Sequence, residues 1–183
     1  MSSPKDKLHI AARTYRLRYV AEEDRILLSA DLSAETELAL PLTRRITRKL
    51  VAALAKYMSE RSRVAQDTHP LLRDTVLEFE HSSSVAKALA EGKMRTERPT
   101  KPITVANKTV HKVRMAAKTN GGLAITFDTS EEAITLHVAP HRIHMVISMF
   151  LRMAERAGWD FPPIASWLDT SESAGETADR VVN

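Results

Sequence analysis

The chain has 183 residues, 43% hydrophobic and 27% charged, with a formal net charge of +4, so it can bury one sizeable core or two small coupled cores. It contains no cysteine, which excludes disulfides, thiol catalysis and cysteine-ligated metal centres. No apolar run reaches the roughly 18 residues of a membrane helix, and the first residues lack the apolar core of a secretory signal, so we expect a cytoplasmic protein without a membrane partner.

Short strands are expected at the start of the chain. Residues 8–24 contain one or two strands, clearest at 15–19, where bulky and basic residues alternate. Residues 26–31 and 37–42 have the pattern of two further strands. Because Pro41 cannot donate to a sheet ladder, the last strand should end there or lie at a sheet edge.

The stretch 42–58 is the strongest helix signal in the chain. Thr43 stands at the position of an N-cap, and we expect the helix to fade at residues 59–63. Its apolar residues recur every four positions, which places them on one helical face: Ile46, Leu50, Leu54 and Met58.

A helical insertion is expected to follow. Residues 64–69 form a polar break, and 71–91 carry an apolar side that begins with Leu72, Val76 and Phe79. Three serines at 82–84 weaken the middle of this region, so it could divide into two short helices. Residues 93–102 then combine basic residues with two prolines, which is typical of a linker.

The second half repeats the pattern of the first at an offset of 96 to 97 residues. Residues 110–115 match 15–19, with Val113 at the position of Leu17, and Asn120-Gly121-Gly122 is a strong hairpin signal. Strands at 123–128 and 133–138 follow. A helix after Pro140 then places three residues at the positions of the first helix's apolar face: Ile143, Ile147 and Leu151.

The expected fold is therefore α+β, with two pseudo-repeated β-β-β-α units whose antiparallel sheets are each covered by a helix. The units occupy residues 1–63 and 103–168, the insertion and basic linker occupy 64–102, and 169–183 form an acidic disordered tail. In its topology this duplicated sheet-plus-helix plan is similar in outline to the Whirly family of single-stranded-DNA-binding proteins. The resemblance is one of topology only, without a diagnostic motif.

Both repeat helices begin with basic residues, where acidic residues would suit the helix dipole. Backbone N–H groups and arginines at a helix start suit phosphate oxygens. The alternative is that acids in the preceding turns neutralise the cations, namely Glu35, Glu37, Glu131 and Glu132. Together with two basic strands, the candidate nucleic-acid contacts are Arg16, Arg18, Arg44, Arg45, Arg48, Lys49, Lys112, Arg114 and Arg142.

Three histidines lie close together in the second half: His137, His141 and His144. Zinc accepts three imidazoles with an open fourth position. The first half has no histidines at the equivalent places, and a metal site usually needs supporting carboxylates. We therefore expect a surface or partner-contacting cluster and no metal.

A methionine stripe marks the second repeat helix, at Met145, Met149 and Met153. Apolar residues cover most of the remaining circumference, so the helix is expected to be buried on several sides. Core packing accounts for the stripe, and a partner interface is the alternative.

No phosphate loop, nucleophile elbow, HExxH motif or cofactor signature is present, so a non-enzymatic protein without a cofactor is favoured. We expect a protein that contacts nucleic acid or another polyanion, single strands included. Aromatic residues are only 5%, which favours phosphate contacts over base stacking and leaves Tyr15 and Tyr19 as strand aromatics. The alternative is an adaptor subunit that assembles with itself or another protein through the methionine-rich helix.

Overall fold

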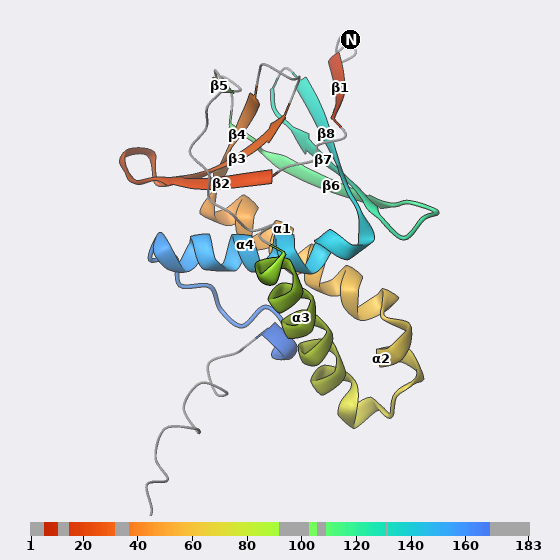
Figure 1. Cartoon of the computed structure of the whole chain (residues 1–183). Coiled ribbons are helices and arrows are strands. Elements are labelled where there is room, and N and C mark those ends of the chain that lie inside the picture. Colours follow the sequence, from red (N-terminus) through yellow and green to blue (C-terminus); the bar gives the residue numbers. More distant parts are fainter. Residues whose placement is uncertain are drawn as a thin grey trace, which may run out of the picture.

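The computed structural model describes residues 6–10, 15–31, 37–91, 103–105, 109–130 and 132–168. It confirms an α+β fold, in which two four-stranded sheets lie above a layer of helices (Figure 1). The strands are β1 Asp6–Ile10, β2 Tyr15–Val20, β3 Arg25–Asp31, β4 Glu37–Thr43, β5 Ile103–Val105, β6 Lys112–Ala117, β7 Leu123–Asp128 and β8 Glu132–Val138. The helices are α1 Arg44–Arg61, α2 Arg63–Asp67, α3 Arg73–Ala90 and α4 Ile143–Arg156, with short 3-10 turns η1 Ala21–Glu23, η2 Pro70–Leu72, η3 Pro140–Arg142 and η4 Ser166–Leu168.

The two halves exchange a strand. Strands β2, β3 and β4 form an antiparallel set, as do β6, β7 and β8, and each set is followed by a helix. This order is consistent with the expected repeat. In addition, β1 pairs in parallel with β8, and β5 pairs in parallel with β4. Each sheet is therefore completed by a strand from the other half of the chain, which the sequence pattern did not indicate.

Pairing corrects the expected alignment of the first strand in each half. Leu28 and Ile125 are equivalent at the repeat offset, and they pair with Leu17 and Met115 respectively. Leu17 therefore corresponds to Met115 and not to Val113. The physical reason is a shorter β6–β7 hairpin, in which nine residues separate the paired Met115 and Ile125, against ten between Leu17 and Leu28, whereas the expected alignment required eleven.

Pro41 lies within β4, which continues to Thr43 and has neighbours on both sides. However, β5 pairs only with the first three residues of β4, so at Pro41 the strand has only β3 beside it. The missing N–H therefore costs no ladder hydrogen bond on the β5 side.

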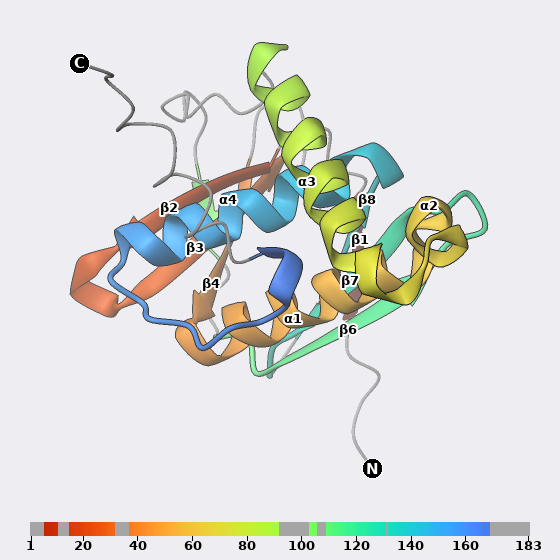
Figure 2. The ribbon, with the colours of Figure 1, turned by 90° about the horizontal axis from the view of Figure 1, so that it is seen from below.

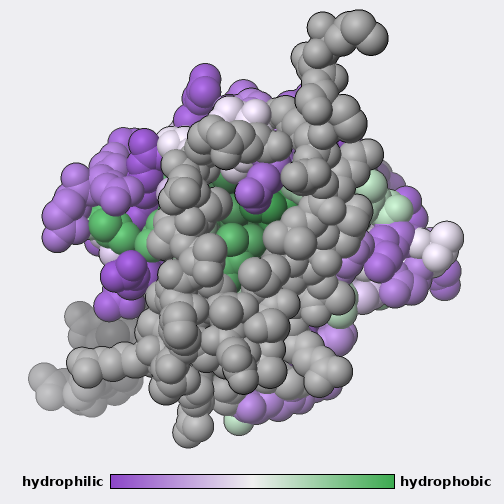
Figure 3. Space-filling view, turned by 90° about the horizontal axis from the view of Figure 1, so that it is seen from above, coloured by the Kyte–Doolittle hydropathy of each residue, from purple (hydrophilic) through white to green (hydrophobic). Residues whose placement is uncertain are grey.

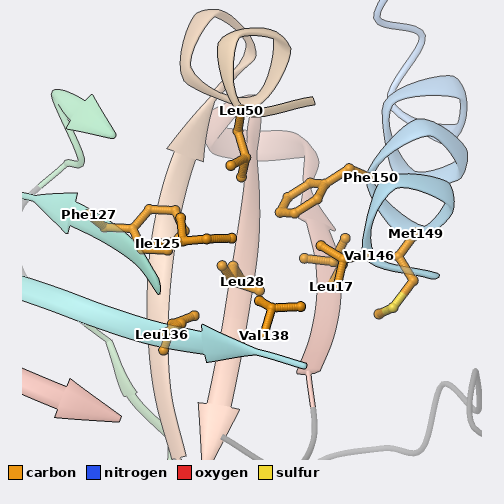
Figure 4. A pocket seen from close by; sticks show the side chains of 10 residues that line it. All are labelled: Leu17, Leu28, Leu50, Ile125, Phe127, Leu136, Val138, Val146, Met149 and Phe150. Atoms are coloured by element: carbon orange, nitrogen blue, oxygen red, sulfur yellow. The ribbon is translucent and has the colours of Figure 1, made fainter. Parts of the chain in front are cut away.

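The core lies between the inner faces of the sheets and helices α1 and α4. Helix α1 contacts β6 and α4 contacts β2, so each repeat helix packs against the other half. Figure 4 shows side chains from β2, β3, β7, β8, α1 and α4 that point toward one another, among them Leu28, Leu50, Phe127 and Phe150. Viewed from above, hydrophobic atoms lie near the centre and hydrophilic side chains lie at the margins (Figure 3). Within the described residues, no helix combines the length and apolar character needed to cross a membrane.

Local capping explains the helix boundaries. The Thr43 hydroxyl accepts the N–H of Ile46 at 3.4 Å, which confirms the predicted N-cap, and α1 ends at Arg61 as expected. Helix α3 is continuous through residues 82–84, so the predicted division into two helices is wrong. Its inner face packs on α4 and η4, and this tertiary contact outweighs the low helix propensity of serine.

The carboxyl-terminal part of the described chain docks on this body. Trp159 is 6% exposed and Trp167 is 2% exposed, so both tryptophans are buried. The Trp159 indole N–H donates to Asp24 Oδ1 at 2.7 Å, and the Trp167 indole N–H donates to the Ser59 hydroxyl at 3.1 Å. These bonds fasten the segment to the β2–β3 turn and to α1. The predicted tail at 169–183 lies outside the described residues.

Candidate polyanion-binding surface

Helix α1 presents a row of cations to solvent. Its 18 residues include six arginines and lysines and one glutamate, and no acid occurs in the first turn. Ile46, Leu50 and Leu54 face the core. The opposite face carries exposed cations at three-, four- and seven-residue spacings, which therefore lie on one side of the helix: Arg45, Arg48, Lys49 and Lys56.

Among the residues that the structure describes, the charges of this row have little compensation. Arg45, Arg48 and Lys49 form no ion pair with any residue that the structure describes. Lys56 Nζ lies 3.8 Å from Glu60 Oε1, an exposed pair that contributes little. Arg44 differs from them because it donates to the carbonyl of Asp160, so it helps to hold the carboxyl-terminal segment.

Two of the four glutamates considered as neutralising partners lie at the wrong end of their strands. Glu37 begins β4 and Glu132 begins β8, whereas the helices follow the far ends, at Thr43 and Val138. A seven-residue strand covers about 20 Å, too far for an ion pair with a helix start. Glu35 and Glu131 lie outside the described residues.

Strand β6 runs beside α1 in the same direction (Figure 2). At one end, Arg25 Nη1 donates to Thr109 Oγ1 at 2.7 Å. Thr109 lies shortly before β6, and Arg25 pairs with Thr43, the residue that precedes α1, so this bond joins the starts of β6 and α1. At the other end, the Tyr57 hydroxyl donates to the Gly121 carbonyl at 2.9 Å. Lys112 is exposed on this neighbouring strand. We call the combined set the α1–β6 surface: Arg45, Arg48, Lys49, Lys56, Lys112 and the exposed Lys118.

The other predicted strand cations do not join this surface as free charges. Arg114 Nε and Nη2 donate to the two carboxylate oxygens of Asp128 at 2.8 and 2.7 Å, and this pairing raises the pKa of Arg114. Arg18 is exposed on β2, the edge strand of the other sheet, which packs on α4. Arg16 is half-buried and already has an interaction partner.

The start of the second repeat helix is not equivalent to the start of the first. His141 is exposed, Arg142 is half-buried with a partner of its own, and His144 is buried. The 3-10 turn η3 replaces the regular first turn that α1 has. The expectation of two matching basic helix starts therefore reduces to one, on α1.

An open groove adjoins the far end of the α1–β6 surface. It lies between the end of α1, the β6–β7 turn and η3, and its lining includes Tyr57, Arg61, Arg63, Gln66 and Asn120. The Arg61 guanidinium lies 5.7 Å from the centre of the Tyr57 ring. Sequence reasoning missed this groove because Arg61 and Arg63 stand where the helix pattern fades, and only tertiary contacts bring the hairpin turn to them.

Tyr19 is not a free platform for base stacking. Its hydroxyl donates to Asp24 Oδ1 at 2.9 Å, and its ring meets Trp159 edge-on with 6.0 Å between ring centres. The hydrogen bond to Asp24 raises the pKa of Tyr19. The side chain of Tyr15 lies outside the described residues.

The three clustered histidines occupy three different environments. His137 is half-buried on β8, His141 is exposed, and His144 is buried against His81 of α3. In the part of the chain that the structure describes, no group of three or more potential ligands could hold a metal ion. His81 lies far away in the sequence, and no local pattern indicated that it would meet His144.

The methionine stripe belongs mainly to the interior. Met145 is 6% exposed and Met153 is 9% exposed, and both are covered by the chain itself. Met149 is half-buried and lines a small apolar cavity beneath the sheets (Figure 4). These positions fit the core interpretation and leave little surface at Met145 and Met153 for a partner.

Comparison of the chain with protein-family models, with curated proteins and with solved structures found no match in any of the three.

Proposed function

We propose that this chain is a non-enzymatic nucleic-acid-binding protein whose α1–β6 surface contacts backbone phosphates. The observation that carries the proposal is the row of exposed cations on α1 without acids in its first turn. An 18-residue helix is about 27 Å long, comparable to about eight phosphates along one strand of a duplex. A cytoplasmic location remains part of the proposal.

Phosphate contacts are favoured over base readout. Arginine and lysine side chains neutralise phosphates irrespective of base identity. Tyr57 is the aromatic residue of α1, and its hydroxyl is bonded to the Gly121 carbonyl. We therefore expect weak sequence preference and a strong dependence of affinity on salt.

The test is fluorescence anisotropy with labelled single-stranded DNA, duplex DNA and single-stranded RNA of equal length. We expect the triple variant Arg45→Ala, Arg48→Ala, Lys49→Ala to lose about tenfold or more in affinity for whichever of these nucleic acids the unmodified chain binds. The matched control removes three exposed cations elsewhere, by Lys87→Ala, Arg152→Ala and Arg156→Ala. Equal losses in both triple variants, or no binding by the unmodified chain at about 50 mM salt, would reject the proposal.

An adaptor role is the second candidate, and a different surface supports it. The exposed large apolar side chains of the described chain lie on α2, η2 and α3, away from the methionine stripe: Val64, Leu71, Leu72, Phe79 and Leu89.

A further inference from the structure

Helix α3 has two apolar faces, and the described part of the chain covers only one of them. Leu77, His81 and Ala88 are buried, since this face packs on α4 and η4. On another face, Phe79 is 73% exposed and Leu89 is 45% exposed. An exposed phenylalanine among exposed leucines is unfavourable in water, so this face requires an explanation.

The exposed face has the spacing of a coiled-coil seam. Starting at Leu72, its residues are separated alternately by three and four positions, which is the a and d pattern of a heptad repeat. All of them are exposed, and none is charged. We call these six residues the α3 seam: Leu72, Thr75, Phe79, Ser82, Ala86 and Leu89.

We propose that the α3 seam docks against the α3 seam of a second copy of this chain, with the two helices antiparallel. In this arrangement the first residue of one seam faces the last residue of the other, so Leu72 meets Leu89 of the second copy. Thr75 then meets Ala86, and Phe79 meets Ser82. Each large side chain thus has either a small residue or another leucine opposite it.

Antiparallel docking fits these side chains better than parallel docking. A parallel pair would place Phe79 against Phe79 and Ser82 against Ser82, which crowds one layer and leaves a void in the next. Antiparallel α3 helices also align their dipoles favourably. Since the seam contains no charge, docking buries no unpaired ion.

The polar Thr75 and Ser82 layers indicate a modest interface, so dimerisation should depend on concentration. Sedimentation velocity of the full chain from about 1 to about 100 µM covers the range expected for a small interface. We expect a shift from monomer to dimer in this range. Phe79→Glu should remain monomeric throughout, and its circular dichroism spectrum should be unchanged because Phe79 makes little contact with the fold.

Lys87→Glu is the matched control, since Lys87 is exposed on α3 outside the seam. It should dimerise like the unmodified chain. A monomeric unmodified chain at all concentrations would overturn the proposal, as would a dimer that survives Phe79→Glu. Because the seam contains no residue of the α1–β6 surface, these results are independent of oligonucleotide binding.

Chain orientation can be tested directly because the chain contains no cysteine. Leu72→Cys and Leu89→Cys variants, carrying different tags, are treated with a short bismaleimide separately and as a mixture. The antiparallel arrangement predicts a cross-link between the two variants in the mixture and little within either variant alone. Cross-linking of each variant to itself would show a parallel pair and overturn the assignment.

Discussion

The Nδ1 atoms of His81 and His144 lie 3.2 Å apart, so one buried imidazole donates a hydrogen bond to the other across the contact between α3 and α4. Both rings also meet Trp167 edge-on, with centres 5.6 and 6.3 Å away. A protonated imidazole has no acceptor nitrogen, so the ring that accepts this bond must be neutral, and protonation of both rings would break the bond and place two charges against each other. This contact links the helical insertion to the second repeat helix.

The histidine pair should make stability depend on pH. Burial and then the charge of His144 lower the pKa of His81 from 6.5 to about 4. Burial also lowers the pKa of His144, which the carboxylate of Glu80 opposes. A lowered folded-state pKa contributes stability that is complete above about pH 6.5 and is lost as pH falls toward 4. We expect the unfolding free energy to fall by about 2 kcal/mol between about pH 7 and pH 4.5, measured by urea denaturation.

The double variant His81→Asn, His144→Asn is the control for this effect, because an amide can supply a donor and an acceptor without titrating in this range. Its unfolding free energy should vary less with pH over the same interval. An identical pH profile in both proteins would show that other groups cause the dependence.

Trp159 should stabilise the chain through its bond to Asp24. Trp159→Phe removes the indole N–H that donates to Asp24 Oδ1 at 2.7 Å and also leaves unfilled volume in a site only 6% exposed. We expect a loss of about 2 kcal/mol in the unfolding free energy. Asp24 has a φ of 48°, which glycine tolerates, so Asp24→Gly removes the acceptor without backbone strain. In a double-mutant cycle, the second change should cost less than it does alone, and strict additivity would contradict the coupling.

The α1 cations should determine the salt dependence of oligonucleotide binding. Each phosphate contact contributes about 0.7 to 0.9 to the slope of log affinity against log salt. Replacing Arg45, Arg48 and Lys49 by alanine should therefore reduce that slope by about 2. Anisotropy titrations at several salt concentrations measure it. An unchanged slope with lower affinity would mean that these side chains act indirectly.

Glycine is required at Gly122 for steric reasons. A Cβ there would lie 2.7 Å from the Val138 carbonyl oxygen, in the tight approach between the β6–β7 turn and β8. Gly122→Ala should lower the unfolding free energy by about 2 to 3 kcal/mol. Gly158→Ala should cost about 1 kcal/mol, since Gly158 has a φ of +65° but nothing within 4 Å of a Cβ. Thermal melts of both variants check the order, and a larger cost at Gly158 would contradict it.

Local chemistry in the sequence was sufficient for much of the element order. The four-residue spacing from Ile46 to Met58, the Thr43 cap and the glycine-rich β6–β7 turn each act within a few residues, so they are visible without a structure. The serines at 82–84 misled for the same reason. Their local preference opposes a helix, but the burial of Leu77 and His81 against distant elements outweighs it.

Only the tertiary structure decided which elements meet. The exchange of β1 and β5 between sheets, the position of β6 beside α1 and the contact of His81 with His144 all join residues far apart in the chain. No local period encodes such pairings, because they depend on how two amphipathic halves bury their apolar faces together. The sequence by itself thus determined most of the elements and the cations on α1, while long-range packing decided which cations lie in one exposed row and which are paired or buried.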